Sequence, residues 1–292
     1  MSLTSQEIAS QPQCWETVLS QSLDHEKALP TKGEHVAVIG CGTSLFMAQA
    51  YAQLREDSGH GATDAYPASV ARLNRRYDRI IALTRSGTTT EILTALAEAD
   101  PATRVTTITA VPDSPAARAA HDVIVLDGAD ERSVVQTRYP TTQLILLLAH
   151  LGHSVERARS DVATALGAPL DPVLLRAEQI TFLGEGWHVG LAHEAALKVR
   201  EAAARWTESY LVKEYRHGPI AVAGPGRAVW SFSPLPAELA DRVEATGAYL
   251  RRPRLDPLAE LVLAQRVAVR LAEDAGRDPD RPQHLTRSVV LA

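Results

Sequence analysis

Residues 36–44 read Val-Ala-Val-Ile-Gly-Cys-Gly-Thr-Ser, and this stretch decides the fold class. The consecutive aliphatic residues indicate a strand that is buried on both faces, and the glycines after it indicate a tight turn. Thr43 and Ser44 then begin a helical pattern. A strand, a turn and a helix in this order are the repeating unit of a parallel sheet covered by helices on both faces.

The same unit recurs along the chain. Residues 79–91 read Arg-Ile-Ile-Ala-Leu-Thr-Arg-Ser-Gly-Thr-Thr-Thr-Glu, and residues 180–186 read Ile-Thr-Phe-Leu-Gly-Glu-Gly. Further strands are predicted at residues 105–109 and 123–126, and one long helix is predicted at residues 140–153. The first half of the chain therefore predicts alternating strands and helices around a parallel sheet.

A glycine and two prolines within residues 167–172 interrupt this pattern, so a domain boundary is expected near residue 165. The predicted domains are residues 1–165 and residues 166–292. The second domain reads as a shortened copy of the first, lacking a strand or two. Its elements are a strand at 180–183, a strand at 228–232, a charged and proline-rich stretch through residue 257, and a last helix at 258–275. We expect an α/β fold of two lobes, each with three layers in which helices flank a parallel sheet.

Composition narrows the class of protein. The chain has 292 residues, of which 45% are hydrophobic, with 35 acidic and 30 basic side chains interspersed. No basic stripe suits nucleic acid and no polybasic cluster suits a membrane surface. The longest apolar run, residues 144–151, is far shorter than the roughly 20 residues of a membrane helix. The two cysteines and an N-terminus without a signal-peptide pattern predict a reducing, cytoplasmic setting.

Two turns rich in hydroxyl groups follow two of the predicted strands, at residues 42–44 and 84–89. The carboxyl ends of parallel strands meet at one edge of a sheet, where helix N-termini offer N–H groups to anions. Serine and threonine also cap helices, and capping would be the preferred interpretation of a single turn. Two such turns together favour a phosphate site. Because no P-loop or dinucleotide fingerprint occurs, we expect a small phosphorylated metabolite rather than a nucleotide.

Residues 193–201 read His-Glu-Ala-Ala-Leu-Lys-Val-Arg-Glu, which places Glu194, Lys198 and Glu201 on one face of a helix. The alternative interpretation is a solvated stripe of ion pairs. A glycine-rich turn before the helix and the loop Glu-Tyr-Arg-His-Gly-Pro at residues 214–219 favour a functional site. His217 lies in that loop, where histidines are often functional.

These motifs resemble the SIS (sugar isomerase) family, typified by the isomerase domain of glucosamine-6-phosphate synthase. Residues 41–44 and 84–89 resemble its two phosphate-gripping turns, residues 131–138 its loop that closes over the sugar, and residues 184–221 its second-lobe active-site region. The resemblance implies that hydroxyl groups hold the sugar 6-phosphate, and that Gln136 helps to position the substrate. The implied phosphate-binding residues are Thr43, Ser44, Thr84, Ser86 and Thr89. Thr84 stands where family members often have serine.

The resemblance also assigns the acid–base groups. It implies that Glu201 is the base that moves a proton at C2 of the sugar, with Glu194 and Lys198 as its partners. His217 would assist ring opening and would come from the neighbouring subunit, so a homodimer is expected. The chemistry fits independently, because removing a weakly acidic α-proton needs an oriented carboxylate with a cation nearby.

The chain departs from the synthase in two places. The predicted first strand begins at Val36 with no glutamine-hydrolysing domain before it, so synthase activity is not expected. Residues 278–289 resemble the tail that brings a lysine to the synthase site, but Arg287 stands at that position. An arginine stays protonated and is a poor nucleophile, so a Schiff base is not expected there. Arg287 can still position an oxygen or stabilise an enolate.

Several outcomes stay open from sequence. An amino-sugar 6-phosphate with a free amino group would be isomerised and deaminated, whereas an N-acetylated one would lose its C3 hydroxyl by elimination. A non-catalytic sugar-phosphate sensor is a further alternative, although the residues before Val36 are too few for a helix-turn-helix domain. His188 and His193 are not spaced as zinc ligands, and no metal or other cofactor is expected.

Overall fold

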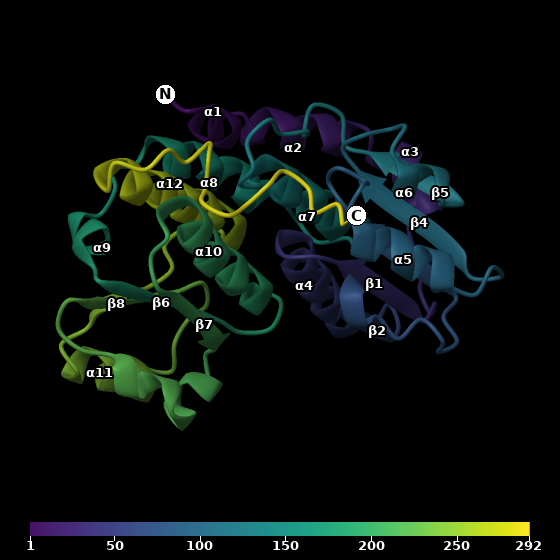
Figure 1. The fold of residues 1–292 in the computed structure, drawn as a ribbon. Coiled ribbons are helices and arrows are strands. Elements are labelled where there is room, and N and C mark those ends of the chain that lie inside the picture. Colours follow the sequence, from purple (N-terminus) through teal and green to yellow (C-terminus); the bar gives the residue numbers. More distant parts are fainter. Residues whose placement is uncertain (292) are drawn as a thin grey trace. The chain divides into compact units, whose positions relative to one another are not determined.

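Two separate parallel sheets organise the chain in the computed structural model, which describes residues 1–291 (Figure 1). Residues 10–155 with 286–291 form one unit, and residues 1–9 with 156–285 form the other. We call them the five-stranded unit and the four-stranded unit, after their sheets. The boundary expected near residue 165 falls inside helix α8 (Glu156–Gly167), which belongs to the four-stranded unit.

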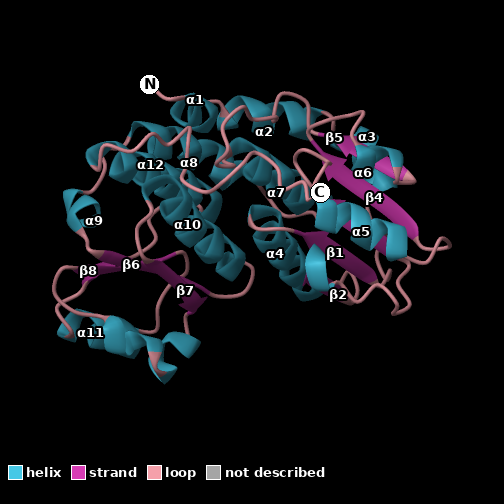
Figure 2. Cartoon of the chain, in the orientation of Figure 1, coloured by secondary structure: helices cyan, strands magenta, loops and turns pink. Residues whose placement is uncertain are grey.

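The five-stranded sheet has the order β2-β1-β3-β4-β5, and all its neighbouring strands are parallel (Figure 2). Val38 of the interior strand β1 pairs with Ala65 of β2 on one side and Ile81 of β3 on the other. The strands are β1 (Val36–Gly40), β2 (Thr63–Pro67), β3 (Arg79–Leu83), β4 (Arg104–Thr109) and β5 (Asp122–Val125).

Helices cover this sheet because successive side chains of each buried strand point to opposite faces. Ile39 and Ile80 pack with Ile92 of α5 in one core cluster, whereas Val38 and Ile81 face the other way and are fully buried as well. The helical elements of the unit are α2 (Gln11–Ser20), α3 (Ser22–His25), η1 (Glu26–Ala28), α4 (Thr43–Asp57), η2 (Ala68–Val70), α5 (Thr90–Glu98), α6 (Pro115–Arg118) and α7 (Arg138–His150).

The four-stranded sheet has the order β7-β6-β8-β9 and is also parallel. Figure 1 shows α10 and α12 on one face and α11 on the other, where Leu183 and Val229 pack with Val243. The strands are β6 (Gln179–Gly184), β7 (Thr207–Leu211), β8 (Arg227–Ser231) and β9 (Tyr249–Arg251). The helical elements are α1 (Leu3–Ala9), α8, α9 (Pro172–Arg176), α10 (His188–Ala203), η3 (Glu214–His217), η4 (Pro219–Val222), α11 (Ala237–Ala245) and α12 (Pro257–Asp274).

The α/β class with parallel sheets flanked by helices is confirmed, but three strands had no sequence signal. These strands, β2, β7 and β9, all lie at sheet edges. Edge strands are partly exposed and tolerate polar residues and proline, so they lack the aliphatic run that marks a central strand. β2 ends in Pro67, and β7 contains Glu208 and Ser209. The second sheet is thus one strand smaller than the first.

Two negative findings apply to residues 1–291. Every helix there is too short or too polar to pass through a lipid bilayer. The same residues contain no group of three or more His, Cys, Asp or Glu side chains arranged to bind a metal ion.

In both sheets, a glycine ends the central strand that leads into a long helix. A Cβ atom on Gly40 would lie 2.5 Å from the backbone carbon of Ser44 in α4, and one on Gly184 would lie 2.4 Å from the backbone oxygen of His188 in α10. Real Cβ atoms essentially never come so close, so any larger residue would push the helix away from the strand. The glycine therefore fixes where each helix begins.

We expect Gly184→Ala to destabilise the protein by about 1–3 kcal/mol, because the added methyl group overpacks a backbone contact. Gly167→Ala is the matched control, since its Cβ would meet no atom within 4 Å at the end of α8. Alanine in a helix should leave the control equally or more stable. Thermal unfolding followed by circular dichroism measures both. Equal melting temperatures for the two variants would contradict the steric argument.

Candidate functional site

The ends of β1 and β3 form a cavity within the five-stranded unit. Its lining consists of Cys41, Ser44, Leu83, Thr84, Arg85, Ser86, Thr89, Ile92, Gln136 and Arg287. The structure therefore brings together all the predicted phosphate-binding residues except Thr43, with the two predicted positioning residues beside them. Thr43 is buried at the start of α4 and does not line the cavity. Burial and the nearby Glu91 raise the pKa of the Cys41 thiol, so this cysteine is not set up as a thiolate nucleophile.

Hydrogen bonds within the turn after β3 orient its hydroxyl groups. Thr84 Oγ1 accepts from the Gly87 N–H at 3.2 Å, and Ser86 Oγ accepts from the Thr88 N–H at 3.3 Å. Because Thr84 Oγ1 accepts in this bond, its hydroxyl hydrogen stays available to a ligand oxygen. Thr89 is the N-cap residue of α5, but its side chain makes no capping hydrogen bond. Simple capping therefore does not explain why Thr89 is a hydroxyl residue.

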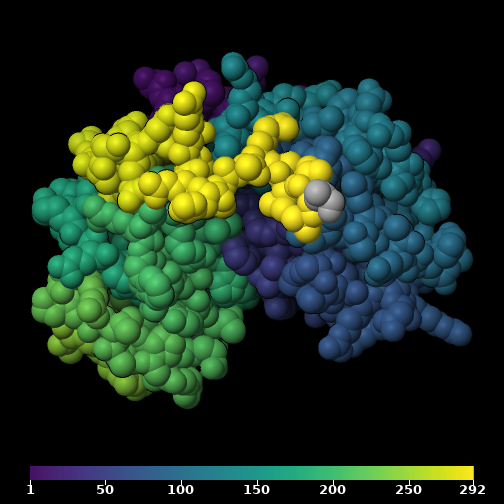
Figure 3. Space-filling model, viewed as in Figure 1, coloured from purple at the N-terminus to yellow at the C-terminus, as the bar shows by residue number. Residues whose placement is uncertain are grey.

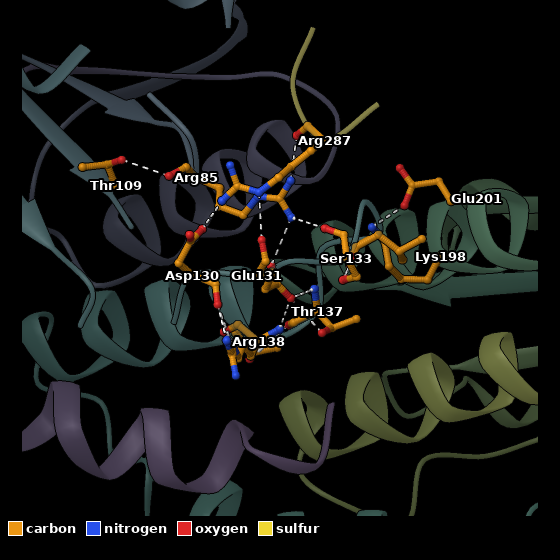
Figure 4. Close-up of polar contacts among 12 residues, drawn as sticks. Arg85, Thr109, Asp130, Glu131, Ser133, Thr137, Arg138, Lys198, Glu201 and Arg287 are labelled. Atoms are coloured by element: carbon orange, nitrogen blue, oxygen red, sulfur yellow. Dashed lines mark hydrogen bonds and ion pairs between the residues drawn. The ribbon is translucent and has the colours of Figure 1, made fainter. Parts of the chain in front are cut away.

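A buried ion pair connects this turn to the loop at residues 130–138 (Figure 4). Arg85 Nη1 lies 3.6 Å from Glu131 Oε2, with the two side chains 1% and 0% exposed. Glu131 Oε1 accepts from the backbone N–H groups of Thr137 at 2.5 Å and Arg138 at 2.8 Å, at the start of α7. The loop that carries Gln136 is thus fixed at both ends by one carboxylate.

Arg287 binds the same loop instead of extending freely into the cavity. Its Nε donates to the Glu131 carbonyl at 2.8 Å, and its Nη2 forms an ion pair with Asp130. Figure 3 shows the end of the described chain in yellow on the surface of the five-stranded unit. The structure therefore gives Arg287 a role in holding the tail, while its action on a substrate remains a prediction.

The predicted acid–base face lies on α10 in the four-stranded unit. Lys198 Nζ is 2.5 Å from Glu201 Oε2 and 3.3 Å from Glu194 Oε1 (Figure 4 shows the pair with Glu201). Glu194 and Lys198 are 0% and 1% exposed, whereas Glu201 is 20% exposed. A solvated stripe of ion pairs does not describe two buried groups, so that alternative is wrong for Glu194 and Lys198. One cation lies between two carboxylates, and Glu201 is the one that solvent reaches.

His217 ends the short helix η3 and is exposed. Among the described residues, its side chain makes no hydrogen bond or ion pair with the Glu194, Lys198 and Glu201 set. The two other histidines considered as metal ligands have separate serine partners. His188 Nδ1 lies 2.8 Å from Ser233 Oγ, and His193 Nδ1 lies 2.8 Å from Ser209 Oγ. Burial lowers the pKa of His188 to about 4, which keeps its ring neutral.

Three residues near the cavity carry no signal in the sequence that predicts a role for them: Arg85, Asp130 and Ser288. The sequence shows Arg85 as a cation between the hydroxyl residues Thr84 and Ser86 of the 84–89 turn. Its side-chain partners are Glu131, the Ser133 carbonyl and the Arg287 carbonyl, which are far away in sequence, and no local pattern connects them to it.

Comparisons with known proteins agree with this architecture. A family model described as the SIS domain matches residues 31–151. A glutamine–fructose-6-phosphate aminotransferase (isomerizing) of Sulfolobus acidocaldarius is 26% identical over 300 residues, covering 88% of this chain and 50% of that protein. The chain thus spans about half the length of the curated relatives it matches.

Two solved structures share the fold of nearly the whole chain. The glucosamine-6-phosphate deaminase of Thermotoga maritima has a TM-score of 0.83 at 24% identity, covering 99% of this chain and 100% of its own. The C-terminal domain of a glucosamine-fructose-6-phosphate aminotransferase from Francisella tularensis has a TM-score of 0.82 at 20% identity, covering 96% and 98%. From the hydroxyl-lined turns and these matches together, we conclude that residues 31–151 of the chain are a SIS domain.

Proposed function

We propose that this chain is a phosphosugar enzyme that removes the C2 proton of an amino-sugar 6-phosphate, acting as an aldose–ketose isomerase with deamination. The observation that carries the proposal is the Lys198 ammonium between two carboxylates, of which only Glu201 is accessible. The hydroxyl-lined cavity supplies a second support, because its donors suit a phosphate. The names of the relatives and structural neighbours, which include an aminotransferase and a deaminase of hexose phosphates, agree with this class.

In this proposal the five-stranded unit binds the phosphate group of the substrate. Ser44, Thr84, Ser86 and Thr89 donate hydroxyl hydrogens to phosphate oxygens, and the start of α5 adds backbone N–H groups. Arg85 contributes little net charge there, because Glu131 pairs with it. The four-stranded unit, which we propose is a second lobe of SIS type, supplies the acid–base groups.

The chemistry begins with ring opening, in which His217 moves the proton of the C1 hydroxyl to the ring oxygen O5 as the C1–O5 bond breaks. Glu201 then takes the C2 proton, and the electron pair of the C–H bond moves toward C1 and its oxygen. Lys198 holds the Glu201 carboxylate in place through their ion pair, and Glu194 in turn holds Lys198. Returning a proton to C1 leaves an iminium at C2 and an alkoxide on C1, and a proton passes from the nitrogen to that oxygen. Water then hydrolyses the resulting imine to a ketose phosphate and ammonia.

Two alternatives share the site and differ in the substrate or outcome. An N-acetylated sugar cannot form the free imine, and its enolate would instead expel the C3 hydroxyl as water. A sensor would bind the phosphosugar without turnover. The expected homodimer, the cytoplasmic setting and the lack of a nucleic-acid partner also remain predictions.

The substrate test is incubation with glucosamine 6-phosphate and, separately, N-acetylglucosamine 6-phosphate, followed by an ammonia assay and mass spectrometry. We expect ammonia from the first sugar, and Glu201→Gln should lower the turnover by roughly 10²–10⁴-fold with little change in affinity. Glu238→Gln, an exposed carboxylate of α11, is the control and should keep normal turnover. A product lighter by one water would identify the lyase, and tight binding without turnover would identify a sensor. Normal turnover in Glu201→Gln would place the base elsewhere.

The exposure of His217 generates a second prediction, about quaternary structure. If His217 acts on the site of a second copy, His217→Ala and Glu201→Ala will each be inactive alone. Co-expressing the two variants should restore up to about one quarter of wild-type activity, because each hybrid dimer contains one site with both native residues. Activity of the co-expressed mixture measures this. If sedimentation shows that the wild-type protein is a monomer, and that monomer is fully active, the shared site is ruled out.

A further inference from the structure

Arg85 binds the C-terminal tail at the position where the tail meets the proposed phosphate turn. We propose that Arg85 is the positioning residue that holds the tail against this turn, so that the hydroxyl of Ser288 becomes a further ligand of the substrate phosphate. This inference rests on the phosphate role given above to the turn at residues 84–89. It assigns a function to two residues that neither the motifs nor the proposed chemistry used.

The backbone of Arg85 is fixed before its side chain makes any contact. Its carbonyl oxygen accepts from Thr109 Oγ1 at 3.0 Å and from the Ala110 N–H at 3.0 Å, where β4 ends. The side chain is 1% exposed, so it leaves the turn through packed protein and not through solvent. The backbone hydrogen bonds and the burial of the side chain therefore restrict the Arg85 guanidinium to one position.

The guanidinium divides its donors between two segments that are distant in sequence (Figure 4). Nη1 donates to the Ser133 carbonyl at 3.1 Å and faces Glu131, whereas Nη2 donates to the Arg287 carbonyl at 2.7 Å. The planar guanidinium of an arginine can donate hydrogen bonds in two directions at once, and the single ammonium group of a lysine cannot reproduce that geometry. Arg85 thus ties the tail to the turn and the loop together.

The tail is fixed on both sides of Ser288. Arg85 holds the residue before it, and the Thr90 N–H donates to the Val289 carbonyl at 3.2 Å after it. Between these anchors, Ser288 Oγ lies 3.1 Å from Ser86 Oγ and 2.8 Å from Thr88 Oγ1. Ser86 Oγ donates its hydrogen bond to Ser288 Oγ, and Ser288 itself does not line the cavity. In our proposal the phosphate takes over the Ser86 hydrogen, and Ser288, released from that bond, turns its own hydroxyl toward the same anion.

The charges around the cavity explain why another hydroxyl matters. The two arginines that line it are each paired with a carboxylate, Arg85 with Glu131 and Arg287 with Asp130. These pairs leave little net positive charge for a phosphate, so its affinity depends on neutral donors. One additional donor then has a measurable effect.

The first test is hydrogen exchange of the tail, measured by mass spectrometry without any ligand. Arg85→Lys should accelerate exchange in peptides covering residues 286–291 while leaving the β1 and β3 peptides unchanged. Arg76→Lys, which changes an exposed arginine, is the matched control and should exchange like the wild type. Unchanged tail exchange in Arg85→Lys would overturn the positioning role.

The second test is calorimetric titration with glucosamine 6-phosphate and with inorganic phosphate. Ser288→Ala should weaken binding by about 10-fold or more, the usual effect of losing one hydrogen bond to a charged group. Thr94→Ala removes an exposed hydroxyl of α5 and should bind normally. Wild-type affinity in Ser288→Ala would overturn the ligand role. Because Ser288 is half-buried near the surface, this variant should fold even if Arg85→Lys does not.

A double-mutant cycle separates positioning from general damage. If Arg85 acts through Ser288, Ser288→Ala should add little loss of affinity in the Arg85→Lys background. Fully additive losses would contradict the coupling. If the wild type binds neither glucosamine 6-phosphate nor inorganic phosphate, the assignment of the phosphate site is wrong, and so is the ligand role of Ser288. The exchange experiment still decides whether Arg85 holds the tail.

Discussion

The close approach between a strand end and the following helix is the constraint on which both functional regions depend. Gly40 and Gly184 each end a central strand, and in each sheet the next helix begins where a Cβ atom would stand. In the five-stranded unit this contact fixes Ser44 at the start of α4. In the four-stranded unit it fixes the start of α10, and the same helix presents Glu194, Lys198 and Glu201 along its following turns. A residue without a side chain thus determines where hydroxyl and acid–base groups lie.

The buried charged side chains in both functional regions are held in ion pairs. Lys198 lies between Glu194 and Glu201, and Arg85 lies against Glu131. Burying such pairs costs desolvation, and replacing them by apolar residues would often be no less stable. Their presence next to a cavity and on one helix face therefore fits chemistry better than stability. The pairing also leaves one carboxylate, Glu201, with both a cation beside it and access to solvent.

Sequence predicted the central elements because a strand buried on both faces must be an aliphatic run, and its glycine and hydroxyl neighbours mark the turn. It predicted the Glu194, Lys198 and Glu201 face for a similar reason, since helical spacing is local. The edge strands β2, β7 and β9 were not predicted, because a partly exposed strand does not need the run of aliphatic residues that marks a buried one. Arg85, Glu131 and Ser288 meet only in three dimensions, so spacing could not connect them. Sequence also did not predict that residues 1–9 belong to the four-stranded unit and residues 286–291 to the five-stranded unit. That assignment depends on packing between segments that are distant in sequence.

Removal of the C2 proton of an amino-sugar 6-phosphate by Glu201 is the central step of the proposed mechanism. The most direct measurement is deuterium incorporation at carbon when the protein acts on glucosamine 6-phosphate in D₂O, with Glu201→Gln compared in parallel. We predict deuterium at C2 of recovered sugar or at C1 of the product for the wild type, and a rate of incorporation lowered by roughly 10²–10⁴-fold for the variant. Exchange at the wild-type rate in Glu201→Gln would contradict this mechanism.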